Sequence, residues 1–411
     1  MTSAERTKRI YERHPYPGTD LGQLSQKGRS FPSLKWMQAI GRPGRAVPER
    51  VLVAGCGTGV EAFVLRRRLP RAEIVAVDFS PRSITVARQL QRAAGSGRPI
   101  TFLVADLTDP ALSRTTGGNF DLISCHGVLS YIPKPGRALR SLASCLRPEG
   151  ALYLGANGEA TPAARLRPWL AGFGLAVDEM KDERRLRELL RLWDSLHDDE
   201  LGELATMPSS YLASDVCGAH FNNWPLARWR AEANRCGWEV AGTDILPTAL
   251  LLTIEREDYL PLYPAGCGAV AARLDQIRPA GFHRMMLRRA EAGGLDLAFA
   301  SKAGQRLRWT GFYAVRFMRN AGHRTVKVVL NCPTFHLRFE WSLTPRQAEA
   351  LRALVASGVV SEGWIKLWTQ SEEARRILWF WLGLGVVAMD AAAQRHRLSN
   401  EVECSPLLSS N

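Results

Sequence analysis

The chain has 411 residues, of which 46% are hydrophobic and 23% are charged, and its net charge is +14. These proportions are ordinary for a folded chain and exclude wholly disordered, collagen-like and coiled-coil proteins. Because a domain usually contains roughly one to two hundred residues, the length predicts two or three domains, each large enough to bury its own core.

Eight cysteines are spread along the chain with no Cys-x-x-Cys pair and no Cys and His spacing typical of a zinc finger. This distribution argues against a disulfide framework and against a structural metal site. Residues 1–13 lack an apolar stretch, and the longest apolar run, 377–389, is too short to span a bilayer. We therefore expect a cytoplasmic protein with no membrane partner and no bound metal.

Basic residues concentrate toward the C-terminal end of the sequence. Residues 272–346 contain fourteen Lys or Arg and four Asp or Glu, so this stretch carries +10 of the net charge. Such a surface suits nucleic acid, an acidic protein or an anionic lipid. The alternative is an Arg-rich face that is only solvated.

The first part of the chain predicts an arm followed by an α/β domain. Residues 1–45 combine a short helix at 3–14 with an aromatic segment that contains Pro and Gly, which indicates an arm or lid. In residues 46–160, apolar strand patterns alternate with helical patterns, which favours a doubly wound parallel sheet. The expected strands are 51–54, 74–78, 101–105, 120–124 and 151–154, and the expected helices are 60–69, 81–94 and 136–146.

The remainder of the chain predicts further units. Residues 161–260 show helical periodicity at 162–201 and 225–236, followed by an apolar run at 249–254, which predicts a helical cap insert and a return to the sheet. Residues 261–343 predict a basic β-rich domain with strands at 306–318, 326–331 and 335–343. Residues 344–411 predict a helical tail with a strand at 386–388, so the C-terminal α+β region would end in a winged-helix-like unit.

Glycines and carboxylates at predicted strand ends indicate a cofactor site. The first strand ends in Gly55-Cys56-Gly57-Thr58-Gly59, and Asp78 ends the next strand, where a carboxylate can accept both ribose hydroxyls of an adenosine group. Asp106 ends the third strand, where an adenine amino group would lie. The spacing G-x-G-x-G and an acid, Glu61, in the first turn of the following helix differ from a pyrophosphate site. A cofactor without phosphates is therefore indicated.

The stretch from Val51 to Ser83 resembles class I S-adenosylmethionine-dependent methyltransferases. It is most similar to the bacterial group that carries a methyltransferase regulatory region, which includes protein-lysine and TPR-fused enzymes. The resemblance extends to residues 120–123, 127–129 and 146–150, but Ser130-Tyr131 replaces the His-His that similar proteins usually carry. It implies a Rossmann-like fold and S-adenosylmethionine as cofactor. The expected cofactor-binding residues are Gly55, Cys56, Gly57, Gly59, Asp78, Phe79, Asp106 and Leu107.

Six further residues are candidates for catalysis or acceptor binding. His126 follows the fourth strand, where it would orient the cofactor or take a proton, and Tyr131 is a second candidate for that role. Their alternative role is hydrogen-bonded structure. Tyr11 and Tyr16 would close over the site as part of a lid, or else pack the arm onto the core. Tyr211 and His220 fall in a stretch that resembles the family's cap motif, which implies an acceptor pocket.

These features together predict a methyltransferase that acts on a protein or peptide side chain, because a basic C-terminal domain offers a docking surface. One alternative is a small-molecule methyltransferase of secondary metabolism. Another is a non-catalytic, cofactor-sensing regulator that binds nucleic acid, although the Trp- and Leu-rich C-terminal helices have few basic residues to enter a groove.

Overall fold

The computed structural model describes two compact units. The first contains the described residues up to 243 and from 271 to 290, and the second contains those from 307 onward. The described residues are 2–18, 47–95, 97–175, 180, 182–196, 204–243, 267–290, 307–309, 314–319, 325–332, 337–358, 364, 367, 368, 371, 374, 377, 378, 381 and 387–389.

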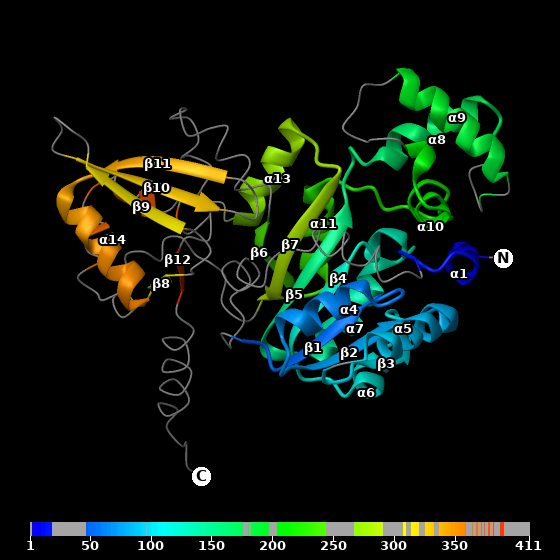
Figure 1. Cartoon of the computed structure of the whole chain (residues 1–411), viewed down its shortest axis with the longest axis horizontal. Helices are drawn as coiled ribbons and strands as arrows, with labels where there is room; N and C mark the ends of the chain where they lie inside the picture. Colours follow the sequence, from blue (N-terminus) through cyan, green and yellow to red (C-terminus); the bar gives the residue numbers. More distant parts are fainter. Residues whose placement is uncertain are drawn as a thin grey trace, which may run out of the picture. The chain divides into compact units, whose positions relative to one another are not determined.

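A seven-stranded sheet in the order β3-β2-β1-β4-β5-β7-β6 forms the centre of the first unit (Figure 1). β1, β2, β3, β4 and β5 pair in parallel, and β7 lies antiparallel between β5 and β6. The predicted doubly wound α/β sheet is therefore confirmed, with its order reversing between β1 and β4. The strands are β1 (Arg50–Ala54), β2 (Glu73–Asp78), β3 (Thr101–Val104), β4 (Phe120–His126), β5 (Leu146–Asn157), β6 (Trp238–Thr243) and β7 (Phe282–Arg289).

The strands and helices of this unit follow from local sequence signals. The apolar residues of β1 and β2 are buried, as parallel strands covered on both faces require. The helix that follows β2 begins where the Ser80 hydroxyl accepts a hydrogen bond from the Ser83 amide, with Pro81 at its first position, and Gly95 ends it. The helices are α1 (Ser3–Arg13), α4 (Val60–Arg68), α5 (Pro81–Ala94), α6 (Leu112–Thr116), α7 (Pro135–Cys145), α11 (Leu226–Arg235) and α13 (Cys267–Ile277).

Strand β7 corrects the predicted boundary at residue 260. Its residues were assigned to a separate basic domain, 261–343, but they pair with both β5 and β6 inside the first sheet. The core residues Met285, Met286 and Leu287 are at most 1% exposed. The methyltransferase-like sheet thus uses a strand more than a hundred residues beyond β5 in the chain. The return strand expected at 249–254 lies outside the described residues.

Helices between β5 and β6 form an insert with a core of its own. Helical periodicity predicted these helices, and the described parts of 162–196 and 225–236 confirm it. Leu166 and Leu170 on one helix pack with Leu186 and Leu190 on the next, and Trp193 closes the cluster. The elements are α8 (Pro162–Gly172), α9 (Glu183–Leu196), the 3-10 turn η3 (Leu204–Thr206), α10 (Ser209–Tyr211) and the π-helical turn η4 (Leu212–Val216).

The second unit combines an antiparallel sheet in the order β11-β10-β9 with a two-stranded pair, β12-β8. A capping box at Thr344 starts α14, as the sequence predicted, and α14 packs against β8, β10 and β11. Trp368 and Trp381 are fully buried, as expected for core residues. The elements are β8 (Leu307–Trp309), β9 (Ala314–Arg319), β10 (Val326–Cys332), β11 (Leu337–Leu343), α14 (Pro345–Ser357) and β12 (Val387–Met389).

The predicted boundary at residue 343 also needs correction. The tail's strand, β12, pairs with β8, which precedes the boundary, and α14 covers strands that precede it as well. Residues 344–411 therefore share their packing with the β-rich segment in the described part of the chain. Among the described residues, none of the helices combines the length and the apolarity needed to cross a membrane.

Candidate cofactor and acceptor site

The glycine turn after β1 lies where the strand order reverses, which is the usual ligand position in open α/β sheets. Gly57 has φ +53°, and a Cβ added to it would lie 2.3 Å from the Tyr16 carbonyl oxygen. Gly59 has φ +94° and forms the N-cap of α4. Both positions therefore require glycine, one for the close approach of the arm and one for its left-handed backbone.

Asp78, at the end of β2, links the next strand to this turn. Its Oδ2 accepts the Gly57 amide at 2.9 Å, and its Oδ1 accepts the Ser80 amide at 2.9 Å. Burial raises the pKa of Asp78 to about 6, although the Ser80 and Gly57 amides oppose that shift. A carboxylate oxygen can accept two hydrogen bonds, so each oxygen retains capacity for a ribose hydroxyl.

The other predicted cofactor residues surround this turn. Asp106 is exposed after β3, and its Oδ1 accepts the backbone amide and the hydroxyl of Thr108 at 2.7 and 2.8 Å. Leu107 is buried, and Phe79 packs edge-on against Tyr11 with ring centroids 5.9 Å apart. Cys56 is buried in the turn beside Gly55, and burial raises the pKa of its thiol well above the ordinary value. At neutral pH this thiol is protonated and acts as a packing group.

Two features of the turn fit an adenosine cofactor with an amino-acid end. The Thr58 hydroxyl is fully buried and has no hydrogen-bond partner among the described residues, so a polar ligand atom would satisfy it. Beside it, Asp78 presents acceptors for paired hydroxyls. Glu61, the acid that excluded a pyrophosphate, is buried against β4, where it accepts a hydrogen bond from Ser124. These residues suit S-adenosylmethionine, with Asp78 on the ribose.

His126, at the end of β4, lies in an aromatic environment. Its Nδ1 is 2.7 Å from the Tyr153 hydroxyl, and its ring lies 4.9 Å from that of Phe282. Burial, followed by the charge of Arg284, lowers the pKa of His126 to about 3. The imidazole is therefore uncharged at neutral pH and a weak proton acceptor.

Asp215, which sequence reasoning did not single out, lies among four tyrosines. Its Oδ1 accepts the Tyr131 hydroxyl at 2.7 Å, and its Oδ2 accepts the Ser214 hydroxyl at 2.7 Å. Tyr16 also hydrogen-bonds to Asp215. We call this group the tyrosine cluster; its members are Tyr11, Tyr16, Tyr131, Tyr211 and Asp215.

The phenols of the tyrosine cluster are hydrogen-bond donors at neutral pH. Burial, and then the negative charge of Asp215, raises the pKa of Tyr11, Tyr131 and Tyr211 above the ordinary value. The charge of Asp78 also raises the pKa of Tyr11. The structure thus brings Tyr11, Tyr16, Tyr131 and Tyr211 together from the arm, the segment after β4 and the insert.

His220 makes a different set of contacts. Its Nε2 is 3.0 Å from Asn222 Oδ1, and the Asn222 amide group donates to the carbonyls of Leu129 and Ile132. His220 is therefore part of the connection that fixes the segment after β4. Asp215 was missed because its partners Tyr16 and Tyr131 belong to segments that are distant from it in the sequence.

The arm contacts both the glycine turn and the insert. The Thr58 amide donates to the Tyr16 carbonyl at 2.9 Å, and the Ser210 hydroxyl donates to the Pro17 carbonyl at 3.1 Å. Near the start of α5, the Ser80 hydroxyl donates to Glu12 at 2.7 Å. The arm therefore lies on the glycine turn, a placement compatible both with the lid and with the alternative in which its aromatic residues pack the arm onto the core.

Comparison with known proteins gives matches to methyltransferases. Residues 52–152 match a family described as a methyltransferase domain. An uncharacterized protein of Synechococcus sp. is 34% identical over 149 residues, which are 35% of this chain and 35% of that protein. The ubiquinone biosynthesis O-methyltransferase of Xanthomonas axonopodis pv. citri is 34% identical over 115 residues, 28% of this chain and 45% of that enzyme. The matches thus span less than half the length of these curated relatives.

A solved structure extends the similarity of fold. PKMT2 from Rickettsia typhi, in complex with AdoHcy, superposes with a TM-score of 0.55 at 15% identity, over 88% of this chain and 76% of that one. At this identity the likeness concerns the fold alone. The family match, the sheet order and the glycine turn together identify residues 52–152 as part of a class I S-adenosylmethionine-dependent methyltransferase domain.

Proposed function

We propose that this protein transfers a methyl group to an amine on a protein or peptide side chain. The observation that carries the proposal is the tyrosine cluster, in which the Asp215 carboxylate lies among phenol rings beside the cofactor turn. A carboxylate and aromatic rings are the groups that attract an ammonium ion, by charge and by cation–π interaction. A neutral hydroxyl acceptor could donate a hydrogen bond to the carboxylate but has no charge for the carboxylate or the rings to attract.

The residues of the site divide the work between cofactor and acceptor. S-adenosylmethionine, when bound, supplies an electrophilic methyl group on a sulfonium that is already a good leaving group. Asp78 and the glycine turn would hold the adenosine part, and Tyr11 is close enough to both Asp78 and Asp215 for their charges to raise its pKa. The Asp215 side attracts and orients the amine, and such positioning supplies much of the rate in a displacement of this kind.

The amine must lose a proton before its nitrogen has a free electron pair. That proton passes to solvent water, while Tyr131, which donates to Asp215 and stays protonated at neutral pH, keeps the carboxylate in place to attract the ammonium form. His126, with a lowered pKa and a hydrogen bond to Tyr153, orients the end of β4. We thus assign to Tyr131 the role of holding Asp215 and to His126 the role of holding the end of β4. Neither residue is assigned the role of proton acceptor.

The insert and the second unit favour a macromolecular acceptor over a small molecule. The insert, with its own buried core, would act as a cap over the acceptor. The second unit, which contributes none of the described cofactor contacts, would provide the docking surface for a macromolecule, with α14 and the β8-β12 pair as its winged-helix-like part. A small-molecule acceptor remains the second candidate because of the O-methyltransferase relatives. Their match covers 115 residues, which is less than the distance in the sequence between Tyr11 and Asp215. The match therefore cannot include both of these residues of the tyrosine cluster.

The test uses the full chain with radiolabelled S-adenosylmethionine and two acceptor sets, lysine-containing peptides and catechol-type phenols. We expect methylated peptide. Asp215→Asn should lower kcat/KM for the peptide by roughly tenfold to a hundredfold, since a hydrogen bond to a charged group contributes about 1.5–3 kcal/mol. Its affinity for S-adenosylmethionine should change less than twofold.

The matched control is Asp109→Asn, an exposed aspartate whose Oδ1 accepts only the local Ala111 amide at 2.8 Å. This variant should behave like the wild type in both measurements. Methylation of phenols but not of peptides, or an Asp215→Asn variant with full activity on amines, would overturn the proposal.

A further inference from the structure

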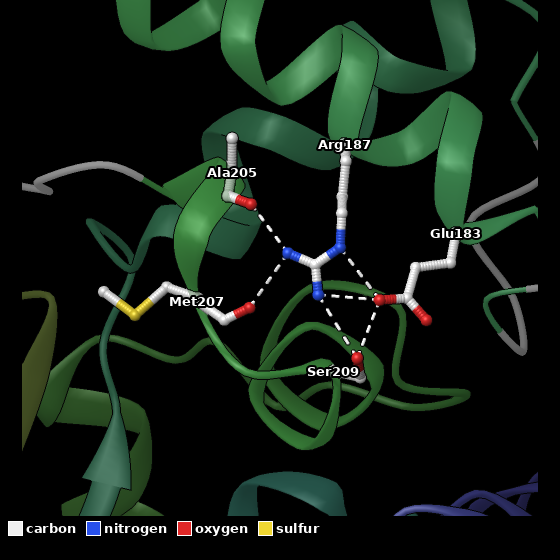
Figure 2. A network of polar contacts seen from close by, with 5 residues as sticks. All are labelled: Glu183, Arg187, Ala205, Met207 and Ser209. Atoms are coloured by element: carbon white, nitrogen blue, oxygen red, sulfur yellow. Dashed lines mark hydrogen bonds and ion pairs between the residues drawn. The ribbon is translucent and has the colours of Figure 1, made fainter.

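A partly buried ion pair on α9, between side chains that are 23% (Arg187) and 37% (Glu183) exposed, holds the segment that leads to the tyrosine cluster (Figure 2). The guanidinium of Arg187 contacts Glu183 through Nε and Nη2, at 2.8 and 2.6 Å. Its Nη1 donates to the carbonyls of Ala205 and Met207, at 2.6 and 3.1 Å. Its Nη2 also reaches the Ser209 hydroxyl at 3.2 Å, and that hydroxyl donates to Glu183 at 2.7 Å. We call this network the Arg187 clamp.

The Arg187 clamp uses the full hydrogen-bonding capacity of the guanidinium. Five contacts from three nitrogens, arranged in a plane, match the five N–H groups of arginine. The Arg187 side chain is 23% exposed, whereas Arg184, which pairs with Glu188 on the same helix, is 91% exposed. Lysine, with three donors on one nitrogen, cannot reproduce this geometry. The clamp is thus a specific structure, and the Arg184 pair is an ordinary surface contact.

The segment held by the Arg187 clamp continues directly into the acceptor side of the site. Ser209 is the first residue of α10, which carries Tyr211, and the π-helical turn η4 that follows carries Asp215. Single π-helical turns are frequent at functional sites. Ser210, next to the clamped Ser209, holds the arm through the Pro17 carbonyl. One network on α9 therefore fixes the start of the element that presents Asp215.

The arm approaches the Arg187 clamp at a second point. His14 lies close enough to Glu183 for each to influence the other's pKa. The Ser209 hydroxyl, followed by the Arg187 guanidinium, lowers the pKa of Glu183, so the carboxylate stays charged at neutral pH. Glu183 thus links the insert, the arm and the segment that leads to the tyrosine cluster. Its described contacts involve neither the glycine turn nor Asp78.

We infer that Arg187 is a positioning residue for the acceptor, which acts by holding Asp215 in place through Ser209 and α10. This inference rests on the amine-methyltransferase activity proposed above. The described hydrogen bonds of Arg187 involve neither the glycine turn nor Asp78, so its removal should act first on the segment that presents Asp215. Acceptor KM should therefore rise while cofactor affinity stays the same.

The test compares Arg187→Lys with Arg184→Lys in the full-length protein, with a lysine peptide as acceptor. Arg187→Lys should raise KM for the peptide about tenfold, change kcat less than threefold and leave S-adenosylmethionine affinity within twofold. Arg184→Lys should match the wild type. In an Asp215→Asn background, Arg187→Lys should add less than a twofold effect, because residues that act through one group are not additive.

The Ser209→Ala variant and hydrogen exchange test the same inference, the latter without depending on activity. Ser209→Ala removes one hydroxyl from the Arg187 clamp and should shift peptide KM in the same direction as Arg187→Lys. Hydrogen exchange of residues 210–217 should speed up in both variants and not in Arg184→Lys, a readout that does not depend on activity. Faster exchange with no peptide methylation by the wild type would refute the proposed function and leave the clamp intact. Unchanged exchange, or an Arg187→Lys effect that persists in full beside Asp215→Asn, would overturn the inference.

Discussion

The Asp78 carboxylate makes cofactor binding depend on pH in a range where few other groups titrate. Burial raises the pKa of Asp78 to about 6, and only the ionised form offers both oxygens to ribose hydroxyls. Binding therefore favours the ionised carboxylate and weakens as the pH falls below 6. At pH 5 about one tenth of the free protein carries that charge, so the dissociation constant for S-adenosylmethionine should be roughly tenfold higher than at pH 7.

Titration calorimetry between pH 5 and 8 measures this dependence. Asp78→Asn keeps the shape of the side chain but should weaken binding at least tenfold at pH 7, because hydrogen bonds to a charged group contribute about 1.5–3 kcal/mol each. It should also abolish the change in affinity for S-adenosylmethionine near pH 6. Glu12→Gln provides the sharper control, since the negative charge of Glu12 contributes to the raised pKa of Asp78; the change in affinity should move to lower pH. A wild-type affinity that is flat from pH 5 to 7 would refute this account of the site.

Three further predictions concern groups that surround the site. Burial raises the pKa of Glu61 to about 7 despite its hydrogen bond from Ser124. In the unfolded chain the pKa is near 4.3, so ionisation of Glu61 lowers the free energy of unfolding by an amount that grows from about pH 4 to pH 7. Glu61→Gln should therefore raise the free energy of unfolding by about 3 kcal/mol at pH 8 and by almost nothing at pH 4 in urea titrations, and equal gains at both pH values would contradict this. His126→Asn should leave the shape of the kcat profile unchanged between pH 5 and 8, because the pKa of His126 is lowered to about 3; loss of an ionisation near pH 6.5 would show the opposite. A chain truncated after residue 256 lacks β7 and leaves the edges of β5 and β6 unpaired, so it should be insoluble, whereas a chain that ends after Ala290 should be soluble and bind S-adenosylmethionine by calorimetry.

The cofactor half of the molecule was predictable because its signals are local. The strands β1, β2 and β4 and the middle of β5 are apolar runs, and the glycine turn follows β1 immediately. Asp78 and Asp106 each end a strand, and parallel strands bring their carboxyl ends to one edge of the sheet. A local pattern therefore fixed both the elements and the positions of the carboxylates. The same holds for α14, whose capping box is visible in the sequence at Thr344 and Gln347.

The missed features depend on partners that are distant in sequence. β7 carries basic residues at Arg284, Arg288 and Arg289, which made it look like part of a basic domain, and only its pairing with β5 and β6 places it in the first sheet. The neighbours and the register of such a strand are determined by which of its faces is buried in the folded sheet.

Asp215 illustrates the same limit for a functional residue. In the sequence it is one aspartate in a polar helical segment, where a solvated side chain is the ordinary outcome. Its importance comes from Tyr131, 84 residues earlier, and from Tyr16 on an arm that crosses the glycine turn. An anion in this setting is stabilised by hydroxyl donors that belong to three separate segments, so no single segment carries the signature. The proposed acceptor site therefore depends on the assembled arm and insert, while the proposed cofactor site depends on the strand ends.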